Sequence, residues 1–295
     1  MSKPAFLGID WGTTNRRVHV LGADGFLLTT QADDKGVLSL TRDQFPAEIA
    51  ALRARFGDLT VIAAGMVGSA RGWVEVPYLP CPVTLGELAG RLCWVEPGRT
   101  AIVPGVAIAD PLRPEVMRGE EVQILGAVQA GLVPPDALLC QPGTHSKWAT
   151  LSGGTLTGFR TAMTGELFAL LRRHSLLSGL LDGPVEPGPD FDAGLALAMQ
   201  GAPLGRLFGE RAAALLGLRD PASVAARVSG LLIGGDVAEQ GLAPGQPVHL
   251  LADGMLARLY ATAIGAAGGT VHPVSSQAAF LAGIIRICLH QNLWS

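Results

Sequence analysis

The chain of 295 residues is long enough for one large domain or two medium ones, and its formal net charge of −3 lacks the basic footprint of a nucleic-acid-binding protein. Its four cysteines have no C-x-x-C spacing, which favours neither a zinc site nor a disulfide framework. Although 48% of the residues are hydrophobic, no run approaches 18 apolar residues and a strand is predicted from residue 5, so we expect no membrane span, no signal peptide and a cytoplasmic location.

A hairpin with a polar turn is predicted at the start of the chain. The apolar run 5–9 predicts a buried strand, and residues 17–21 alternate as the returning strand. Asp10 ends the first strand, and the turn that follows contains Gly12, Thr13, Thr14, Asn15 and Arg16. Backbone N–H groups of such a turn can cradle a phosphate, and a carboxylate beside them can hold Mg²⁺. An ordinary hairpin with a polar turn is the alternative.

The connection to the next strand contains a second candidate binding loop. A helix is predicted over 41–56 with Thr41 as its cap, followed by an apolar strand over 60–64. A glycine-rich loop begins at the carboxyl end of this strand, where α/β sheets bind ligands. The notable residues of the loop are Gly68, Ser69, Arg71, Trp73 and Tyr78. Packing of the aromatic rings is the alternative to ligand binding.

Paired acids lie beyond a region of irregular structure. Residues 77–114 are rich in proline and predict short strands at most, and Pro114 suits the first turn of a helix over about 114–130. Glu120 and Glu121 lie near the start of that helix, where they would either complement its macrodipole or supply a general base.

The pattern of the first hairpin recurs in the second half of the chain. The apolar run 137–141 leads into a similar turn, in which Gly143 aligns with Gly12 and Lys147 aligns with Arg16. The residues of this turn are Gly143, Thr144, His145, Ser146 and Lys147. The repeat indicates a duplicated domain with two phosphate-facing turns, and we place the boundary so that the domains comprise 1–133 and 134–295.

The remainder of the second half is expected to be mainly helical. Thr164 would cap a helix through Leu181, and further helices are predicted at 192–201, 204–217 and 221–240, the last interrupted by glycines. A strand over 247–251 leads through Asp253 and Gly254 into another helix. A short strand at 269–272 and a helix at 275–290 complete the prediction.

Several blocks, in order along the chain, resemble the 2-dehydro-3-deoxygalactonokinase family of the superfamily that also contains sugar kinases, actin and heat-shock chaperone ATPases. The blocks are Gly8–Asn15, Gly65–Ser69, Gly72-Trp73, Pro77–Pro80, Met117–Glu121, Pro142–Trp148 and Met163–Phe168. The resemblance implies an α/β fold with two domains of the actin-like ATPase (ribonuclease H-like) type, each with a mixed sheet flanked by helices, around a nucleotide cleft. It also implies ATP-dependent phosphorylation of 2-dehydro-3-deoxy-D-galactonate at the 6-hydroxyl in galactonate degradation.

The resemblance further implies roles for individual residues. Asp10 would hold Mg²⁺, and the two turns, at 12–16 and 143–147, would grip the phosphates of ATP. Glu120 would accept the proton of the sugar hydroxyl, with Asp110 as the alternative base. Gly254 would approach the adenosine.

The sugar acid is assigned to the loop after the strand at 60–64. Its members would be Gly68, Ser69, Arg71, Trp73 and Tyr78, with the guanidinium of Arg71 on the substrate carboxylate because an arginine fork fits a carboxylate. Arg118 and Arg160 are the alternatives for that cation. Asp253 would either contact the nucleotide or cap its helix.

Other functions remain compatible with the sequence. The phosphate turns would also suit a kinase for a different sugar acid or an amino sugar, and a non-catalytic, nucleotide-dependent binding or regulatory protein belongs to another class. The expected partner is a small-molecule sugar acid, with no nucleic acid and no membrane, and assembly as a homodimer is left open. Release of ADP with a panel of sugar acids would separate these functions.

Overall fold

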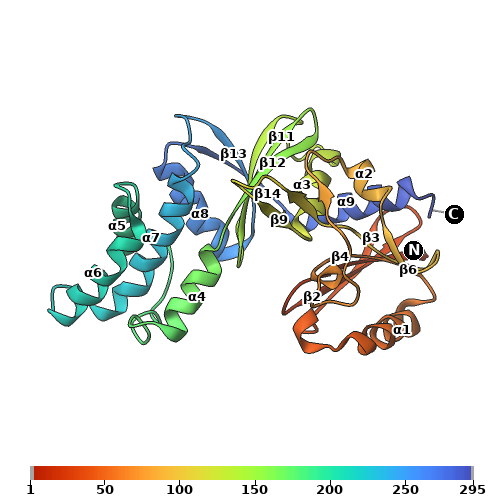
Figure 1. Ribbon diagram of the computed structural model, residues 1–295, viewed down its shortest axis with the longest axis horizontal. Coiled ribbons are helices and arrows are strands. Elements are labelled where there is room, and N and C mark those ends of the chain that lie inside the picture. The colour runs from red at the N-terminus through yellow and green to blue at the C-terminus, as the bar shows by residue number, and fades with distance from the viewer. Residues whose placement is uncertain (1–2, 294–295) are drawn as a thin grey trace. The chain divides into compact units, whose positions relative to one another are not determined.

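Two sheets with related strand orders organise the chain (Figure 1). The structure is a computed structural model that describes residues 3–293. The first of two units comprises the chain up to Asp136, the segment Ala149–Phe159 and the segment from Ser276 onward, and the second comprises Ala137–Trp148 and Arg160–Ser275. The expected α/β class, with mixed sheets flanked by helices, is confirmed.

The first unit is built on a six-stranded sheet in the order β3-β2-β1-β4-β7-β6. β1 pairs antiparallel with β2 and parallel with β4, so Asp10 lies opposite Arg17 on one side and Ala64 on the other. Phe6, Leu7 and Ile9 are buried, as expected for an apolar strand inside a sheet. The strands are β1 (Pro4–Trp11), β2 (Arg16–Gly22), β3 (Leu27–Asp33), β4 (Thr60–Gly65), β6 (Cys93–Glu96) and β7 (Thr100–Ile102).

Helix α1 (Phe45–Phe56) packs on this sheet, as its apolar spacing predicts. Phe45, Ile49 and Leu52 lie in one buried cluster with residues of β1 and β4. A 3₁₀ turn, η2 (Arg42–Gln44), precedes the helix, and the backbone N–H of Thr41 donates to Oε1 of Gln44 at 2.8 Å. The regular helix therefore begins later than expected.

The prediction of a helix from Pro114 is wrong. Residues 115–117 form β9 (Glu115–Met117), which pairs antiparallel with β8 (Val106–Ile108) in a small sheet that also contains β5 (Leu79–Pro80). Gly119 then adopts φ +111°, which favours glycine, and α3 (Glu120–Gln129) begins after it. A short helix that the sequence did not suggest, α2 (Leu85–Ala89), precedes β6.

The last helix, α9 (Ser276–His290), belongs to the first unit, whereas the sequence placed all residues after 133 in the second domain. α9 packs on α3, beside which it lies in Figure 1. The two backbones are so close that a Cβ on Gly126 would lie 2.1 Å from the carbonyl oxygen of Ala279, and one on Gly283 would lie 2.3 Å from that of Val122. Glycine at both positions permits this contact.

The second sheet repeats the start of the first. Its order is β12-β11-β10-β13-β14, in which a consecutive three-strand segment precedes two parallel strands, as in β3-β2-β1-β4-β7. The strands are β10 (Ala137–Gln141), β11 (Ser146–Ser152), β12 (Thr155–Ala162), β13 (Pro247–Leu251) and β14 (Thr270–Val274). The shared order supports the duplication inferred from the two turns.

Helices form the rest of the second unit. α5 and α7 pack through glycines: a Cβ on Gly194 would lie 2.1 Å from the carbonyl oxygen of Arg227, and one on Gly230 would lie 2.2 Å from that of Phe191. The glycines of α7 do not interrupt the helix, which corrects the prediction. The helix expected to run through Leu181 ends at His174. The helices are α4 (Thr164–His174), α5 (Pro189–Ala198), α6 (Pro203–Leu215), α7 (Val224–Ala238) and α8 (Gly254–Ala266). Within residues 3–293, no helix is long and apolar enough to cross a bilayer.

Candidate active site

The first turn has the backbone of an anion cradle. The N–H of Gly12 donates to the carbonyl of Asn15 at 2.9 Å, and the N–H groups of residues 36–38 donate to the carbonyls of residues 12–14. Gly36 is required there, because a Cβ would lie 2.3 Å from the carbonyl carbon of Thr14. Thr13, Thr14 and Asn15 are exposed, and no hydrogen bond from their backbone N–H groups is found within the described chain. Three consecutive amides are therefore available to an anion.

Asp10 lies beside this turn at the end of β1 and is partly exposed. Burial raises the pKa of its carboxyl, the charge of Glu120 raises it further, and Arg17 opposes both effects from 3.5 Å. The two carboxylates therefore lie close enough to repel each other, which a cation between or beside them would relieve. Mg²⁺ binds through one or two carboxylates together with phosphates, so Asp10 and Glu120 are the residues here that could hold it. Within residues 3–293 no group of three or more His, Cys, Asp or Glu side chains that could hold a metal ion is found.

Glu120 and Glu121 differ sharply in their surroundings. Both carboxylate oxygens of Glu121 accept the N–H of Gly119, at 2.8 and 2.7 Å, and its side chain is buried. Burial raises the pKa of Glu121 to about 8, and the charge of Glu120 adds to that effect. Glu120 is partly exposed and accepts the N–H of Arg118 at 3.1 Å, so it is the member of the pair open to a substrate.

The alternative base, Asp110, lies on an exposed loop. Its Oδ1 accepts the N–H of Leu112 at 2.9 Å, an arrangement that closes a local turn. Gly119, at the head of α3, contacts the end of β4: a Cβ there would lie 3.0 Å from Cα of Gly65. This contact sets the head of α3, and with it Glu120, against the strand that lies beside Asp10 in the sheet.

The expected sugar-acid loop follows β4 as a compact turn, η3 (Met66–Gly68). The N–H and hydroxyl of Ser69 both donate to the carbonyl of Met66, at 3.0 and 2.7 Å. Trp73 is half-buried and its ring stacks on Phe45 with centroids 6.1 Å apart, so the packing interpretation holds for much of its surface. Arg71 is exposed, and the ring of Tyr78 lies 4.2 Å from Cζ of Arg118.

Arg16, aligned with Lys147, does not face a phosphate with its side chain. Its guanidinium is buried and holds both oxygens of Asp33, at 3.1 and 2.7 Å, and Oε2 of Glu48 at 3.1 Å. Lys147 is likewise buried, and its Nζ donates to the hydroxyl of Thr161 at 2.9 Å. These contacts correct the expectation that the two cations grip phosphates.

A buried carboxylate on α7 holds the second turn. Asp236 accepts hydrogen bonds from Nε1 of Trp148, the hydroxyl of Thr164 and the hydroxyl of Tyr260, at 2.9, 2.9 and 2.6 Å. Tyr260 also bonds the hydroxyl of Ser146, which fixes the turn to α8. Thr164 is the first residue of α4 rather than its cap. Burial raises the pKa of Tyr260, and the charge of Asp236 raises it further.

The exposed part of the second turn contacts the start of α4. Nε2 of His145 lies 2.6 Å from Oε2 of Glu166, and the N–H of Glu166 donates to the carbonyl of Thr144 at 2.9 Å. Gly165 must be glycine there, because a Cβ would lie 2.4 Å from the carbonyl oxygen of Gly143. The turn is thus shaped by backbone contacts, as the first turn is.

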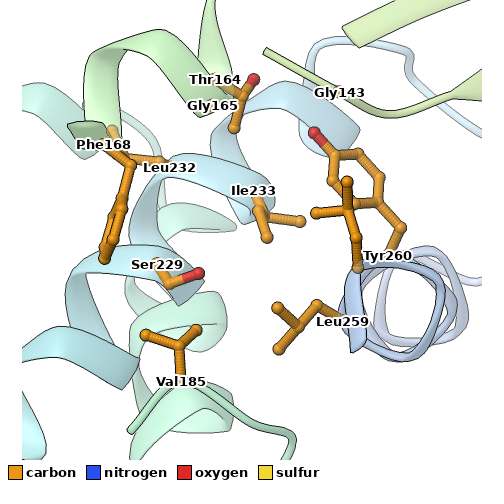
Figure 2. A pocket seen from close by; sticks show the side chains of 11 residues that line it. Gly143, Thr164, Gly165, Phe168, Val185, Ser229, Leu232, Ile233, Leu259 and Tyr260 are labelled. Atoms are coloured by element: carbon orange, nitrogen blue, oxygen red, sulfur yellow. The ribbon is translucent and has the colours of Figure 1, made fainter. Parts of the chain in front are cut away.

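A cavity of about 180 Å³ lies beside the second turn. Figure 2 shows the rings of Phe168 and Tyr260 on opposite sides of it, with Ile233 between them. Gly254 begins α8, whose Leu256, Leu259 and Tyr260 supply one wall. Mostly apolar walls with a few polar groups are typical of small-molecule sites. Asp253 is exposed and makes no capping side-chain bond to α8 in the described chain.

Three residues of these arrangements were not identified from the sequence. Asp236 could have been noticed as a lone acid within the apolar run of residues 228–237, and Tyr260 as one of two tyrosines. Glu166 lies near the start of the helix expected from Thr164, and nothing there indicates His145 as its partner. No local pattern connects these residues, because their contacts join segments far apart in the chain.

The fold defines the class of the protein, and the comparisons define its family. The activator of 2-hydroxyisocaproyl-CoA dehydratase from Clostridium difficile has a similar fold, with a TM-score of 0.50 at 11% identity over 97% of this chain and 96% of that one. Together with the two related sheets, this likeness shows that the fold is of the actin-like ATPase and sugar-kinase type. The family model for 2-keto-3-deoxy-galactonokinase matches residues 10–287, so the chain belongs to that family.

Individual relatives agree with this assignment. A Rhizobium meliloti (strain 1021) protein named "Probable 2-dehydro-3-deoxygalactonokinase DgoK1" is 36% identical over 95% of each chain. The 2-dehydro-3-deoxygalactonokinase of Escherichia coli (strain K12) is 35% identical over 95% of this chain and 96% of its own. A crystal structure of a Sinorhizobium meliloti protein assigned to the same enzyme has a TM-score of 0.87 at 33% identity, covering 96% and 98% of the two chains. The resemblance inferred from the motifs is confirmed.

Proposed function

We propose that this protein transfers the terminal phosphoryl group of ATP to the 6-hydroxyl of 2-dehydro-3-deoxy-D-galactonate. Membership of the 2-keto-3-deoxy-galactonokinase family carries the proposal. The site supports it: Asp10 lies beside three available amides of the first turn, and Glu120 is close enough to raise its pKa. An acidic pair beside an anion cradle is what phosphoryl transfer to an alcohol requires.

The chain's own groups have separate tasks in this reaction. The amides of residues 13–15 would bind phosphate oxygens, and Glu120 would accept the proton as the sugar hydroxyl attacks. Mg²⁺, held by Asp10, would neutralise charge on the phosphates when bound. Arg16 and Lys147 would support the two turns from inside, since their cations are already bonded within the fold.

The cavity in the second unit is proposed as the adenine site. It adjoins Gly143 of the second phosphate turn and is lined mainly by apolar side chains, which suit the faces of a purine ring. The hydroxyls of Thr164 and Ser229 give it polar groups that could orient the base. Gly254 would then contribute as the first residue of α8, whose side chains form one wall of the cavity. His145 and Ser146 would contribute by holding the turn in shape.

We further propose a cytoplasmic location and a homodimer. Free thiols at all four cysteines suit a reducing compartment. For the dimer, Leu204, Phe208 and Leu215 recur along one face of α6, and each is between 61% and 69% exposed. Leu176, Leu216 and Leu218 are exposed as well, and exposed apolar side chains that gather on one face mark protein–protein interaction sites. A second copy related by a two-fold axis would bury the same face on both chains.

Light scattering after size-exclusion chromatography tests the dimer. Phe208→Glu should convert a dimer into a monomer, whereas Leu112→Glu, at an isolated side chain that is 89% exposed, should leave it intact. A wild-type protein that is monomeric at high concentration would contradict the dimer.

The reaction is tested by ADP release in the presence of Mg-ATP. The protein should turn over with 2-dehydro-3-deoxy-D-galactonate and more slowly with its gluconate epimer, other sugar acids and amino sugars. Glu120→Gln should lower kcat by roughly 10²–10⁴-fold and leave ATP binding intact, because it removes only the base. Glu121→Gln is the matched control, since Glu121 is buried and turned to the backbone. Nucleotide binding without ADP release for any acceptor would favour the non-catalytic alternative.

A further inference from the structure

A buried arginine with unused donors lies behind the proposed sugar-acid loop. Arg118, in the connection between β9 and α3, is only 8% exposed. Its Nη2 donates to the carbonyl of Val76 at 2.7 Å. Its Nε and Nη1 are buried without a hydrogen-bond partner among residues 3–293.

The loop surrounds this guanidinium. The Tyr78 ring lies 4.2 Å from Cζ of Arg118, and the carbonyl of Val76 bonds its Nη2. Nη1 lies so close to Gly68 that a Cβ on that glycine would be 2.9 Å away. Gly68, Val76 and Tyr78 of the loop therefore all contact the Arg118 guanidinium, which belongs to the same unit.

This cation has no anion at ion-pair distance in the described part of the chain. Glu121, whose pKa burial raises and the charge of Arg118 partly lowers, directs both oxygens to the N–H of Gly119 instead. A buried charge without a partner is strongly unfavourable, and a protein can retain one where a ligand supplies the missing partner. A carboxylate is the group that a planar guanidinium matches best.

We infer that Arg118, rather than the exposed Arg71, binds the carboxylate of the sugar acid. This inference rests on the proposed function. The backbone N–H of Arg118 donates a hydrogen bond to the carboxylate of Glu120. The side chain of Arg118 therefore leads from the proposed base to the proposed carboxylate site. That span is comparable with the carbon chain that separates the carboxylate of the substrate from its 6-hydroxyl. Because Nε and Nη1 contact no solvent, binding requires the segment from Gly68 to Tyr78 to shift.

Arg118→Met keeps an unbranched side chain against Tyr78 and removes the charge. We expect the KM for the sugar acid to rise about 10- to 100-fold, as for the loss of a charged hydrogen bond, and the KM for ATP to stay unchanged. An arginine with a purely structural role would instead leave the KM for the sugar acid unchanged in the folded variant, and that result would overturn the inference.

The decisive measurement compares the sugar acid with its neutral carboxamide as acceptors. Wild-type protein and the matched control Arg71→Met should prefer the acid, Arg118→Met should show no preference, and Arg118→Lys should keep part of it. If Arg118→Met keeps the preference, or Arg71→Met loses it, the carboxylate site is elsewhere. Failure of the wild-type protein to phosphorylate the acid would instead contradict the proposed function itself.

Discussion

The two turns join corresponding strands of related sheets, but different side chains support them. Ion pairs support the first turn, whereas a carboxylate that accepts hydrogen bonds from uncharged donors supports the second. Behind the first turn, the Arg16 guanidinium binds Asp33 and Glu48, and Lys35 also pairs with Glu48 at 2.8 Å. Behind the second, a single carboxylate, Asp236, gathers uncharged donors in the interior. The comparison teaches that the two aligned cations, Arg16 and Lys147, are both bonded inside the fold, so that neither turn depends on an exposed cation.

A second difference concerns the residue before each turn. Asp10 is the last residue but one of β1, and Gln141 occupies the aligned position at the end of β10. The first turn can therefore combine amides with a metal-binding carboxylate, whereas the second has an amide side chain there. The metal proposed above therefore belongs to the first turn, and the proposed nucleotide positioning belongs to the second.

Removal of the acid from the first turn should have the largest effect. Asp10→Asn is expected to lower kcat roughly 100-fold or more, because the carboxylate that would hold Mg²⁺ is lost. Steady-state ADP release at rising Mg²⁺ or Mn²⁺ should show partial recovery. Asp34→Asn, at an exposed acid, is the control. Full activity in Asp10→Asn would remove the distinction between the two turns.

Removal of the carboxylate behind the second turn should mainly affect stability. Asp236→Ala leaves the donors of Trp148, Thr164 and Tyr260 without their acceptor, so the free energy of unfolding should fall by about 3–5 kcal/mol. Urea unfolding measures this, with the exposed Asp192→Ala as reference. The KM for ATP should rise in the folded variant, and an unchanged midpoint would show that the network contributes little.

The ion pairs of the first turn should contribute less. Arg16→Met should lower the free energy of unfolding by about 2–3 kcal/mol, because Asp33 and Glu48 keep some solvent contact and Glu48 keeps Lys35. Arg17→Met, at the exposed neighbour, should change it little. A larger loss in Arg16→Met than in Asp236→Ala would reverse the ranking of the two supports.

Lowering the pH should have the smallest effect on the free energy of unfolding. Burial raises the pKa values of Asp33 and Glu48, but hydrogen bonds and charge from Arg16 and Lys35 outweigh it, so both lie below their ordinary values of 3.8 and 4.5. Carboxyls with lowered pKa values stabilise the fold above the ordinary values and lose that contribution as pH falls through the folded ones. Unfolding measured from pH 6 to pH 3 should show the decline beginning below about pH 4.5, and more weakly in Arg16→Met. Identical profiles would exclude these pairs as the source.

Local patterns predicted the features that depend on neighbouring residues. The strands at 5–9 and 60–64 and both turns were predicted because apolar runs and glycine turns are determined over a few residues. The inward position of Arg16 was not, because its acids lie 17 and 32 residues away. Nothing near Asp236 in the sequence reveals Trp148, which is 88 residues distant. The helix expected from Pro114 was wrong for a different reason, since residues 115–117 pair with β8 as a strand and their own composition does not indicate this pairing.

The position of α9 affects the order in which the two units can fold during synthesis. A ribosome releases the segments of the second unit before Ser276, yet the first unit lacks its helix against α3 until that later segment appears. Domains commonly fold as units during synthesis, the earlier one first. Here the order is reversed: the second unit can close while the first waits with the Gly126 face of α3 uncovered. Nascent chains that stop before Ser276 should therefore depend on chaperones that shield apolar helix surfaces.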